Sequence, residues 1–168
     1  MTTHELRRAA WTAEPHPVSA PESELLLRRY VTELIVRYYG RPTDDREIDE
    51  VLALEPSHDL TRPTGEFLVA RRDGLPSGCV GLRVLDAATV ELTRMFVVPE
   101  ARRQGGADVL VTAAEGVARD TFGAAAIRLD TRTDLVEARA LYIKHGFAEI
   151  APYNDSVYAG HWFEKKLL

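Results

Sequence analysis

The sequence contains a single cysteine and no long apolar run, and each absence narrows what the protein can be. Cys79 has no second cysteine to pair with, so an intramolecular disulfide is excluded and a reducing compartment is expected. No metal or redox spacing accompanies it, which favours a strand-interior thiol over a nucleophile. No stretch approaches the roughly 20 apolar residues that span a bilayer, and residues 1–5 lack the order of a signal peptide. We therefore expect a cytoplasmic protein with no membrane partner.

An excess of basic residues is also absent. Asp and Glu together number 26 and Lys and Arg 21, which gives a formal net charge of -5. Nucleic-acid-binding domains normally carry a basic face, so no nucleic-acid partner is expected, and an anionic ligand must be met by local donors. The length of 168 residues, with 45% hydrophobic and 28% charged residues, suits one domain over residues 1–168. A homodimer is left open.

Apolar periodicity, interrupted by Gly and Pro, predicts the order of strands and helices. Strands are expected at 6–13, 67–70, 79–85, 90–98, 127–129, after 147 and at 162–167. Helices are expected at 21–39, 45–54, 105–121 and 135–145, the first capped by Ser19 or Ser23 and ended by Gly40. This order indicates an α/β (α+β mixed) fold: a central mixed, largely antiparallel twisted sheet of six or seven strands with helices on both faces.

The segment 91–107 carries the clearest chemical signal, a strand that leads through a turn into a helix. Gly105 and Gly106 stand where unpaired N–H groups and the positive end of the helix dipole favour an anion. Arg102 and Arg103 add cationic donors at the same place. The simpler interpretation is a tight turn made by the glycines. The spacing fits neither the dinucleotide fingerprint nor the nucleoside-triphosphate loop, which leaves coenzyme A as the remaining common phosphate-bearing cofactor.

Two motifs, in this order, resemble the GNAT superfamily of N-acetyltransferases. Arg102-x-x-Gly105-x-Ala107 is similar to the Arg/Gln-x-x-Gly-x-Gly/Ala signature that follows a strand and a proline. The segment 138–147 is similar to the Ala-x-x-Leu-Tyr-x-x-x-Gly-Phe segment of that superfamily. The resemblance covers residues 6–168, is clearest from 90 to 147, and points to its small, bacterial-type members.

The resemblance implies acetyl-CoA as the cosubstrate and a set of residues that hold it. The strand that ends at Val97 would splay from its parallel neighbour near Ile127 and pair with the pantetheine arm as with an added strand. Backbone N–H groups of residues 103–108 would hold the pyrophosphate, while Arg102 supports the turn or a phosphate. The implied cofactor-binding residues are Met95, Phe96, Val97, Arg102, Arg103, Gln104, Gly105, Gly106, Ala107 and Asp108.

The resemblance also implies a catalytic acid. Tyr142 matches the tyrosine that, in many family members, lies near the thioester sulfur and protonates the departing thiolate. The alternative for Tyr142 is a packed aromatic on an amphipathic helix. Tyr142 also separates an enzyme from a module that only binds acyl-CoA, because the latter has no need of a phenol near the sulfur.

Glu91 is the candidate base, since several relatives carry a glutamate there that acts through water. The alternative is a strand carboxylate paired with Arg83 or Arg94 across strands. Strict alternation along the strand would place Thr93 and Met95 on the face of Glu91, and Arg94 on the other.

Two departures from the family pattern matter. Many relatives have Asn or Gln seven residues before the tyrosine, where this chain has Leu135, so the contact is missing or is supplied by Arg139 or Asp134. Arg103 replaces the usual small residue after the signature arginine and is expected to point to solvent or to the adenosine 3′-phosphate.

The histidines and one loop remain to be placed. His145 is expected to end a helix, His58 to lie in a loop, and His161 to stand beside the acceptor site or to have no role there. The segment 152–158 suits a pocket wall, a rigid turn, or both. No set of His, Cys or carboxylates has ligand spacing, so no metal is expected.

The sequence therefore predicts an acetyl-CoA-dependent N-acetyltransferase. The acceptor would be a primary amine of a small molecule or peptide, which attacks the thioester directly. The alternative is a non-catalytic acyl-CoA-binding sensor or partner module. The identity of the amine does not follow from the sequence, because pocket residues come from variable helices and loops.

Overall fold

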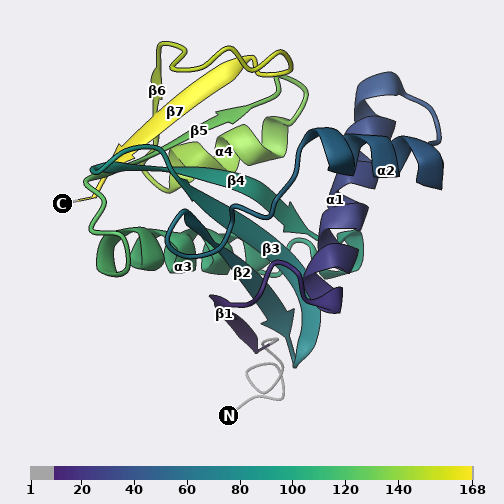
Figure 1. Cartoon of the computed structure of the whole chain (residues 1–168), viewed down its shortest axis with the longest axis horizontal. Coiled ribbons are helices and arrows are strands. Elements are labelled where there is room, and N and C mark those ends of the chain that lie inside the picture. Colours follow the sequence, from purple (N-terminus) through teal and green to yellow (C-terminus); the bar gives the residue numbers. More distant parts are fainter. Residues whose placement is uncertain (1–9, 168) are drawn as a thin grey trace, which may run out of the picture.

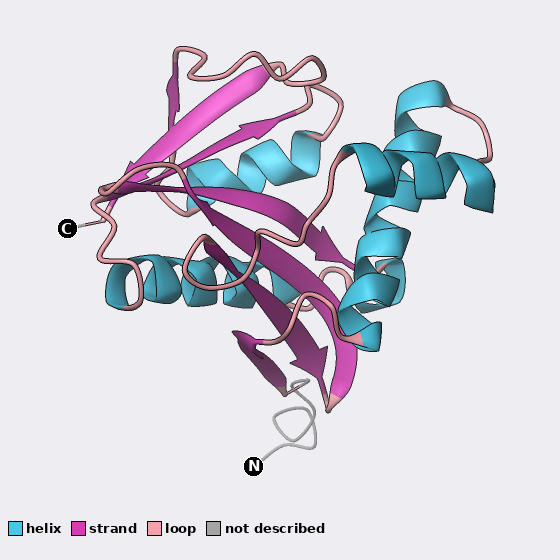
Figure 2. Ribbon diagram, viewed as in Figure 1, coloured by secondary structure: helices cyan, strands magenta, loops and turns pink. Residues whose placement is uncertain are grey.

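A mixed sheet of seven strands forms the centre of the molecule (Figures 1 and 2). The computed structural model describes residues 10–167. The strands are β1 (Trp11–Pro15), β2 (Gly65–Arg72), β3 (Leu75–Val84), β4 (Thr89–Val97), β5 (Ala126–Thr131), β6 (Ala148–Ile150) and β7 (His161–Lys166), in the order β1-β2-β3-β4-β5-β7-β6. Within the described residues only β4 and β5 run parallel, and the other neighbours are antiparallel. The predicted mixed, largely antiparallel sheet is confirmed.

Helices cover both faces of this sheet (Figure 1). Leu68 and Val80 pack with α3 on one face, whereas Phe67 and Cys79 pack with α1 on the other, as strand alternation requires. Helix α4 lies on the α3 face, and α2 packs against α1. The bounds are α1 (Pro21–Tyr39), α2 (Asp45–Leu54), the 3-10 turn η2 (Pro99–Ala101), α3 (Gly106–Asp120) and α4 (Val136–Lys144).

The N-terminal part differs from the sequence prediction in two details. The strand expected over 6–13 is observed at Trp11–Pro15, and the first part of the expected range lies outside the described residues. A proline can end this strand because β1 lies at the edge of the sheet. Neither predicted serine caps α1: the residue before the helix is Ala20, and the Ser23 hydroxyl donates to the carbonyl of Pro17 at 2.7 Å.

Strand β4 carries one extra residue relative to β3, which makes a β-bulge. Thr93 stands opposite Gly81 and Phe96 opposite Cys79, so two residues of β4 face a single residue of β3. Arg94, in the bulge, has a left-handed backbone with φ 57°. This conformation costs a non-glycine residue about 1 kcal/mol or more.

The bulge reverses the alternation of side chains along β4. Leu92 packs into the α3 cluster, yet Phe96 packs into the α1 cluster although both numbers are even. The predicted grouping of Met95 with Glu91 is therefore wrong, because Met95 packs against the α3 cluster. Arg94 instead contacts Ser57 and the Glu55 carbonyl in the segment that follows α2. Strict period-two counting fails here because it assumes an unbroken ladder.

Candidate active site

A wedge opens between β4 and β5 where the two strands stop pairing. Their parallel ladder ends at the pair Glu91–Arg128, whereas β5 goes on pairing with β7 as far as Thr131 and His161. Among the described residues, β4 from Leu92 to Val97 thus has a strand neighbour only in β3. An exposed strand edge of this kind is a place where an extended ligand can pair with the backbone.

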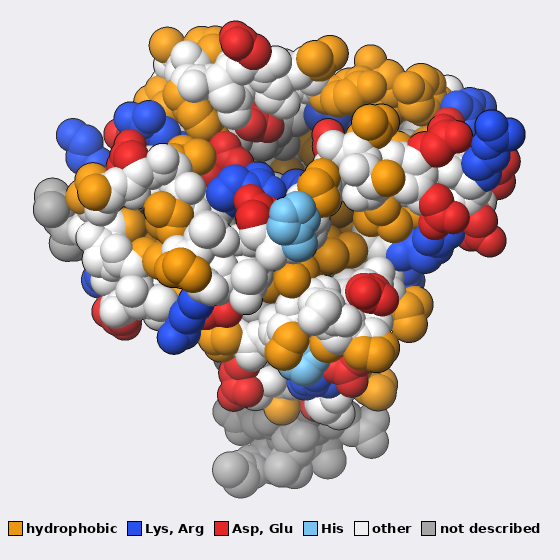
Figure 3. Space-filling view, in the orientation of Figure 1, with side chains coloured by type: hydrophobic (Ala, Val, Ile, Leu, Met, Phe, Trp, Pro, Cys, Tyr) orange, Lys and Arg blue, Asp and Glu red, His pale blue; other side chains and the backbone are white. Residues whose placement is uncertain are grey.

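A cavity of about 780 Å³ lies at this wedge and extends toward α1 and α2. Residues 91–95 of β4 and 130–132 at the end of β5 line it from the sheet, and Tyr142 lines it from α4. Figure 3 shows this face of the molecule hollowed, with side chains of both charges and a histidine at the rim. The aromatic residues of the remaining wall are Tyr30, Tyr38, Tyr39 and Tyr158.

Tyr142 is both packed and part of the cavity wall. Its side chain is 5% exposed and meets Phe147 edge-on, with ring centroids 5.7 Å apart. Burial raises the pKa of the Tyr142 phenol above its ordinary value near 10. The hydroxyl therefore stays protonated at neutral pH and is able to donate a hydrogen bond into the cavity.

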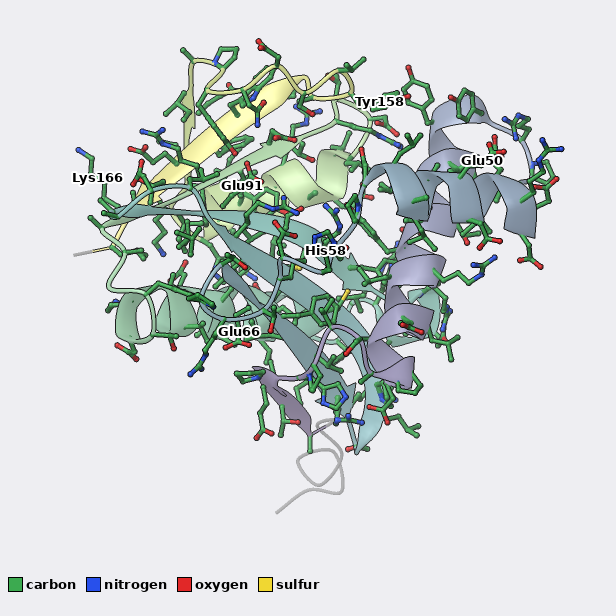
Figure 4. The ribbon with its side chains drawn as sticks, in the orientation of Figure 1. Glu50, His58, Glu66, Glu91, Tyr158 and Lys166 are labelled. Atoms are coloured by element: carbon green, nitrogen blue, oxygen red, sulfur yellow. The ribbon has the colours of Figure 1, made fainter. Side chains whose placement is uncertain are left out.

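Glu91 is held from two sides. One carboxylate oxygen accepts from the Tyr153 hydroxyl at 2.8 Å, and the other lies 3.3 Å from Nη1 of Arg83. The predicted cross-strand pair with Arg83 is present, and the one with Arg94 is absent from residues 10–167. The carboxylate still lines the cavity, and Figure 4 shows Glu91 and His58 near the middle of the same face.

The partners of Glu91 fix its surroundings. Arg83 also donates to both carboxylate oxygens of Asp59, at 2.5 and 3.2 Å, and this bond holds the pKa of Asp59 below its ordinary value. Burial, and then the nearby Glu91 charge, raises the pKa of Tyr153. At neutral pH Tyr153 is therefore a neutral donor and Asp59 an ionised acceptor.

The turn before α3 leaves several backbone N–H groups free. Gly105 caps the helix with φ 88°, and the first helical bond runs from Val109 N–H to the Gly105 carbonyl at 3.1 Å. The amides of Gly106, Ala107 and Asp108 precede that bond and so have no acceptor within the helix. The start of α3 thus has the geometry that the sequence predicts for a phosphate.

The two glycines of the turn are required for different reasons. Gly105 is needed for its left-handed backbone, although a side chain there would meet open space. Gly106 is needed for packing, because a Cβ would lie 2.5 Å from the Trp11 ring. The Trp11 indole N–H in turn donates to the Gln104 carbonyl at 2.8 Å. Trp11 therefore braces the turn from β1.

Arg102 is occupied by protein groups. Its Nε donates to the Val97 carbonyl at 2.9 Å, and its Nη2 lies 2.7 Å from both oxygens of Glu33. This ties the turn to the end of β4 and to α1. Of the two roles predicted for Arg102, the arrangement favours support of the turn over contact with a phosphate.

Comparison with known proteins assigns the chain to a family. The family model described as the acetyltransferase (GNAT) family matches residues 28–147. The chain is a GNAT acetyltransferase. A relative, the IAA acetyltransferase of Azospirillum brasilense, is 34% identical over 115 residues, which are 65% of this chain and 74% of the relative. The chain is accordingly an acyltransferase.

Solved structures share the fold of this acetyltransferase. The PaiA N-acetyltransferase of Thermoplasma acidophilum, in complex with coenzyme A, has a TM-score of 0.72 at 19% identity, over 94% of this chain and 99% of that one. A GNAT-family acetyltransferase of Staphylococcus aureus Mu50 has a TM-score of 0.72 at 17% identity, over 95% and 100%. At these identities the likeness shows the fold alone.

The other predicted cofactor-binding residues of the acetyltransferase lie along one path from the wedge to the turn. Met95 lines the cavity, and Phe96 is buried against α1. Arg103 and Gln104 are exposed at the turn. The Asp108 carboxylate contacts Lys144 at 2.9 Å and His145 at 2.8 Å, and its pKa is lowered first by the Lys144 bond and then by the His145 bond.

Leu135 itself lines the cavity where relatives have an amide side chain. The two predicted substitutes differ: the Asp134 carboxylate has an ion-pair partner, whereas the Nε of Arg139 is buried without a hydrogen-bond partner in the described structure. Asp134 is paired with Arg132 at 2.7 Å, and Arg139 donates to the Thr133 carbonyl at 3.1 Å. The acetyltransferase therefore offers an apolar group at this place.

The three histidines considered in the sequence lie in different surroundings. His58 lines the cavity, whereas His145 binds Asp108 and His161 pairs with Glu149. The 152–158 segment is both wall and turn: Asn154 lines the cavity while it donates to Asp130 at 2.8 Å. Sequence reasoning missed the place of the α1 tyrosines and of Arg94 on the cavity wall, which no motif marks.

Two further observations concern ligands and membranes. No helix within residues 10–167 has both the length and the apolar character needed to cross a membrane. In that same range, no three His, Cys, Asp or Glu side chains gather as a candidate metal site. The absence of a metal remains a prediction.

Proposed function

We propose that this acetyltransferase moves the acetyl group of acetyl-CoA to a primary amine of a small molecule or peptide, at the wedge between β4 and β5. One observation carries the proposal: the open edge of β4 joins the free amides at the start of α3 to a cavity that contains Tyr142 and Glu91. Relatives whose structures contain coenzyme A or acetyl-CoA support the choice of cosubstrate.

Backbone groups would bind acetyl-CoA. The amides of residues 103–108 would hold the pyrophosphate through unpaired N–H groups and the helix dipole. Residues Leu92 to Val97 would pair with the pantetheine arm along the edge that β5 leaves open. This places the thioester at the cavity.

In the proposed reaction one bond forms and one bond breaks. The amine nitrogen attacks the carbonyl carbon, a C–N bond forms, and the C–S bond breaks to leave a thiolate and an amide. Tyr142 donates a hydrogen bond to the sulfur as it gains charge, and Glu91 accepts the amine proton through water. Burial raises the pKa of the Tyr142 phenol and keeps it protonated, so the hydroxyl is available as the donor to the sulfur.

The experiment that tests the proposal measures free thiol released from acetyl-CoA with and without each member of an amine panel. An N-acetyltransferase releases thiol in proportion to an acetylated amine found by mass spectrometry. An acyl-CoA-binding module would bind acetyl-CoA in calorimetry and release no thiol with any amine. That result would contradict the proposal and would show that the protein is an acyl-CoA-binding module.

A further inference from the structure

Three arginines line the cavity, and two of them are neutralised. Arg83 is paired with Asp59 and Glu91, and Arg132 is paired with Asp134 at 2.7 Å. Arg94 has no carboxylate within 4 Å among residues 10–167. It is the cation of this cavity that the described protein leaves uncompensated.

The contacts of Arg94 are all with neutral oxygens. Its guanidinium donates to the Thr93 hydroxyl at 2.9 Å, to the Ser57 hydroxyl at 3.3 Å and to the Glu55 carbonyl at 3.3 Å. These bonds orient the planar group and leave its charge in place. A guanidinium that is fixed, charged and on a cavity wall is suited to a carboxylate, which it binds by two parallel hydrogen bonds.

The backbone explains how the charge reaches the cavity. Without the bulge, Arg94 would share the face of Leu92, in the apolar cluster under α3. The left-handed φ of 57° and the extra residue of β4 turn it to the opposite face, where it lines the cavity and contacts Ser57 and the Glu55 carbonyl. Strain of this kind persists where the surrounding structure enforces it, and it gathers at functional sites.

Two carboxylates line the wall of the same cavity at the wedge. Glu91 belongs to the last pair between β4 and β5, and Asp130 lies on β5 beyond that pair. Asp130 accepts from Asn154 at 2.8 Å and has no arginine or lysine partner in the described residues. An ammonium group would be stabilised at that wall and a carboxylate at Arg94.

From this arrangement we infer that Arg94 binds a carboxylate of the acceptor, so that the acetyltransferase acts on amines that also carry a carboxylate. The inference rests on the proposed function and narrows its substrate class. The amine would face Glu91 and Tyr142, and the carboxylate would face Arg94. The wall of Tyr30, Tyr38 and Tyr158 suits an apolar or aromatic side chain between them.

The test compares each amino acid with its own amide, for example L-phenylalanine with L-phenylalaninamide. The pair differs in the charge that Arg94 would bind and keeps the size of the substrate. In the native protein kcat/KM should favour the acid. In Arg94→Met that preference should fall about 10- to 100-fold, mainly through KM, because one charge-assisted pair is lost. Arg94→Lys should keep part of the preference, since it keeps the charge and loses the fork.

Two controls make the result specific. Arg46→Met removes the same charge at a site whose side chain is 89% exposed, and it should leave the acid-to-amide ratio unchanged. Phenylacetate and phenylacetamide need no variant: the acid should inhibit the native protein in competition with the amine, and the amide should not.

An unchanged acid-to-amide ratio in Arg94→Met, or equal inhibition by phenylacetate and phenylacetamide, would overturn the inference while the proposed function stands. Transfer only to amines that lack a carboxylate would do the same. A failure of every amine to be acetylated would overturn the proposed function together with the inference.

Discussion

Each candidate catalytic side chain both supports the packing and lines the cavity. Tyr142 packs against Phe147 and also lines the cavity, so its packing does not exclude the catalytic role that the resemblance implies. Glu91 is a cross-strand partner of Arg83 and also faces the cavity. A contact that supports the fold therefore does not remove a residue from consideration for the chemistry.

Removal of the Tyr142 hydroxyl should reduce turnover. Tyr142→Phe keeps the ring in its packing, so acetyl-CoA affinity and thermal unfolding should stay near the native values. If the hydroxyl assists the departing thiolate, kcat should fall roughly 10²–10⁴-fold. Calorimetry and thiol release on one preparation measure both quantities. Native turnover in this variant would leave Tyr142 with packing as its role.

The Glu91 variant should show a pH-dependent defect. Glu91→Gln removes the proton acceptor, so kcat/KM should fall about 10²-fold near neutral pH, where most of the amine is protonated. Part of the loss should be regained at alkaline pH, where the amine is already neutral. A deficit of equal size at every pH would indicate positioning instead, because Glu91 also holds Tyr153.

Local pairing at Glu91 could be predicted because residues a short hairpin apart fall opposite each other. The position of the Arg94 side chain could not be predicted in this way. A bulge is fixed by how β3 and β4 pair along their length, and alternation in the sequence gives no sign of the extra residue.

At the scale of elements, the helix start and the strand edge make the binding path. The prediction of helices and strands was correct to within a few residues because Gly and Pro mark their ends, as at Gly40. The cap of α1 was wrong, since the Ser23 hydroxyl bonds outside the helix. Tertiary contacts decide such details, and the sequence carries them only weakly.

The phosphate site at α3 is best tested by a charge at Gln104. This residue is exposed, and its backbone is not in the left-handed conformation that favours glycine. Gln104→Glu should weaken acetyl-CoA binding about 5- to 30-fold through repulsion of the pyrophosphate, and less at high salt. The same charge near a helix N-terminus favours the folded state, so unfolding should not become easier.

Gln104→Ala is the matched control for calorimetry, because it removes the side chain without adding charge. Its affinity should lie near the native value. Equal affinity of the Glu and Ala variants at low salt would show that the pyrophosphate binds elsewhere. Gly105 is less suited to this test, since its φ of 88° strains any other residue.

At the scale of the whole molecule, the cavity arises from segments far apart in the chain. Walls come from α1, the loop after α2, β4, the end of β5, α4 and the 152–158 segment. The sequence predicted the order of these elements and the two family motifs, but the meeting of their side chains depends on how β4 and β5 diverge. The resemblance to the family implied that divergence, whereas no single segment fixes which side chains meet there. One domain over residues 1–168 and a cytoplasmic location stay predictions.

The most direct measurement is a crystal structure of the protein with acetyl-CoA. The account predicts the pyrophosphate oxygens within about 3 Å of the amide nitrogens of residues 103–108, and the pantetheine arm paired with β4 between Leu92 and Val97. The thioester sulfur should lie within hydrogen-bonding reach of the Tyr142 hydroxyl. Acetyl-CoA bound outside the wedge, or with its thioester remote from Tyr142, would contradict the account.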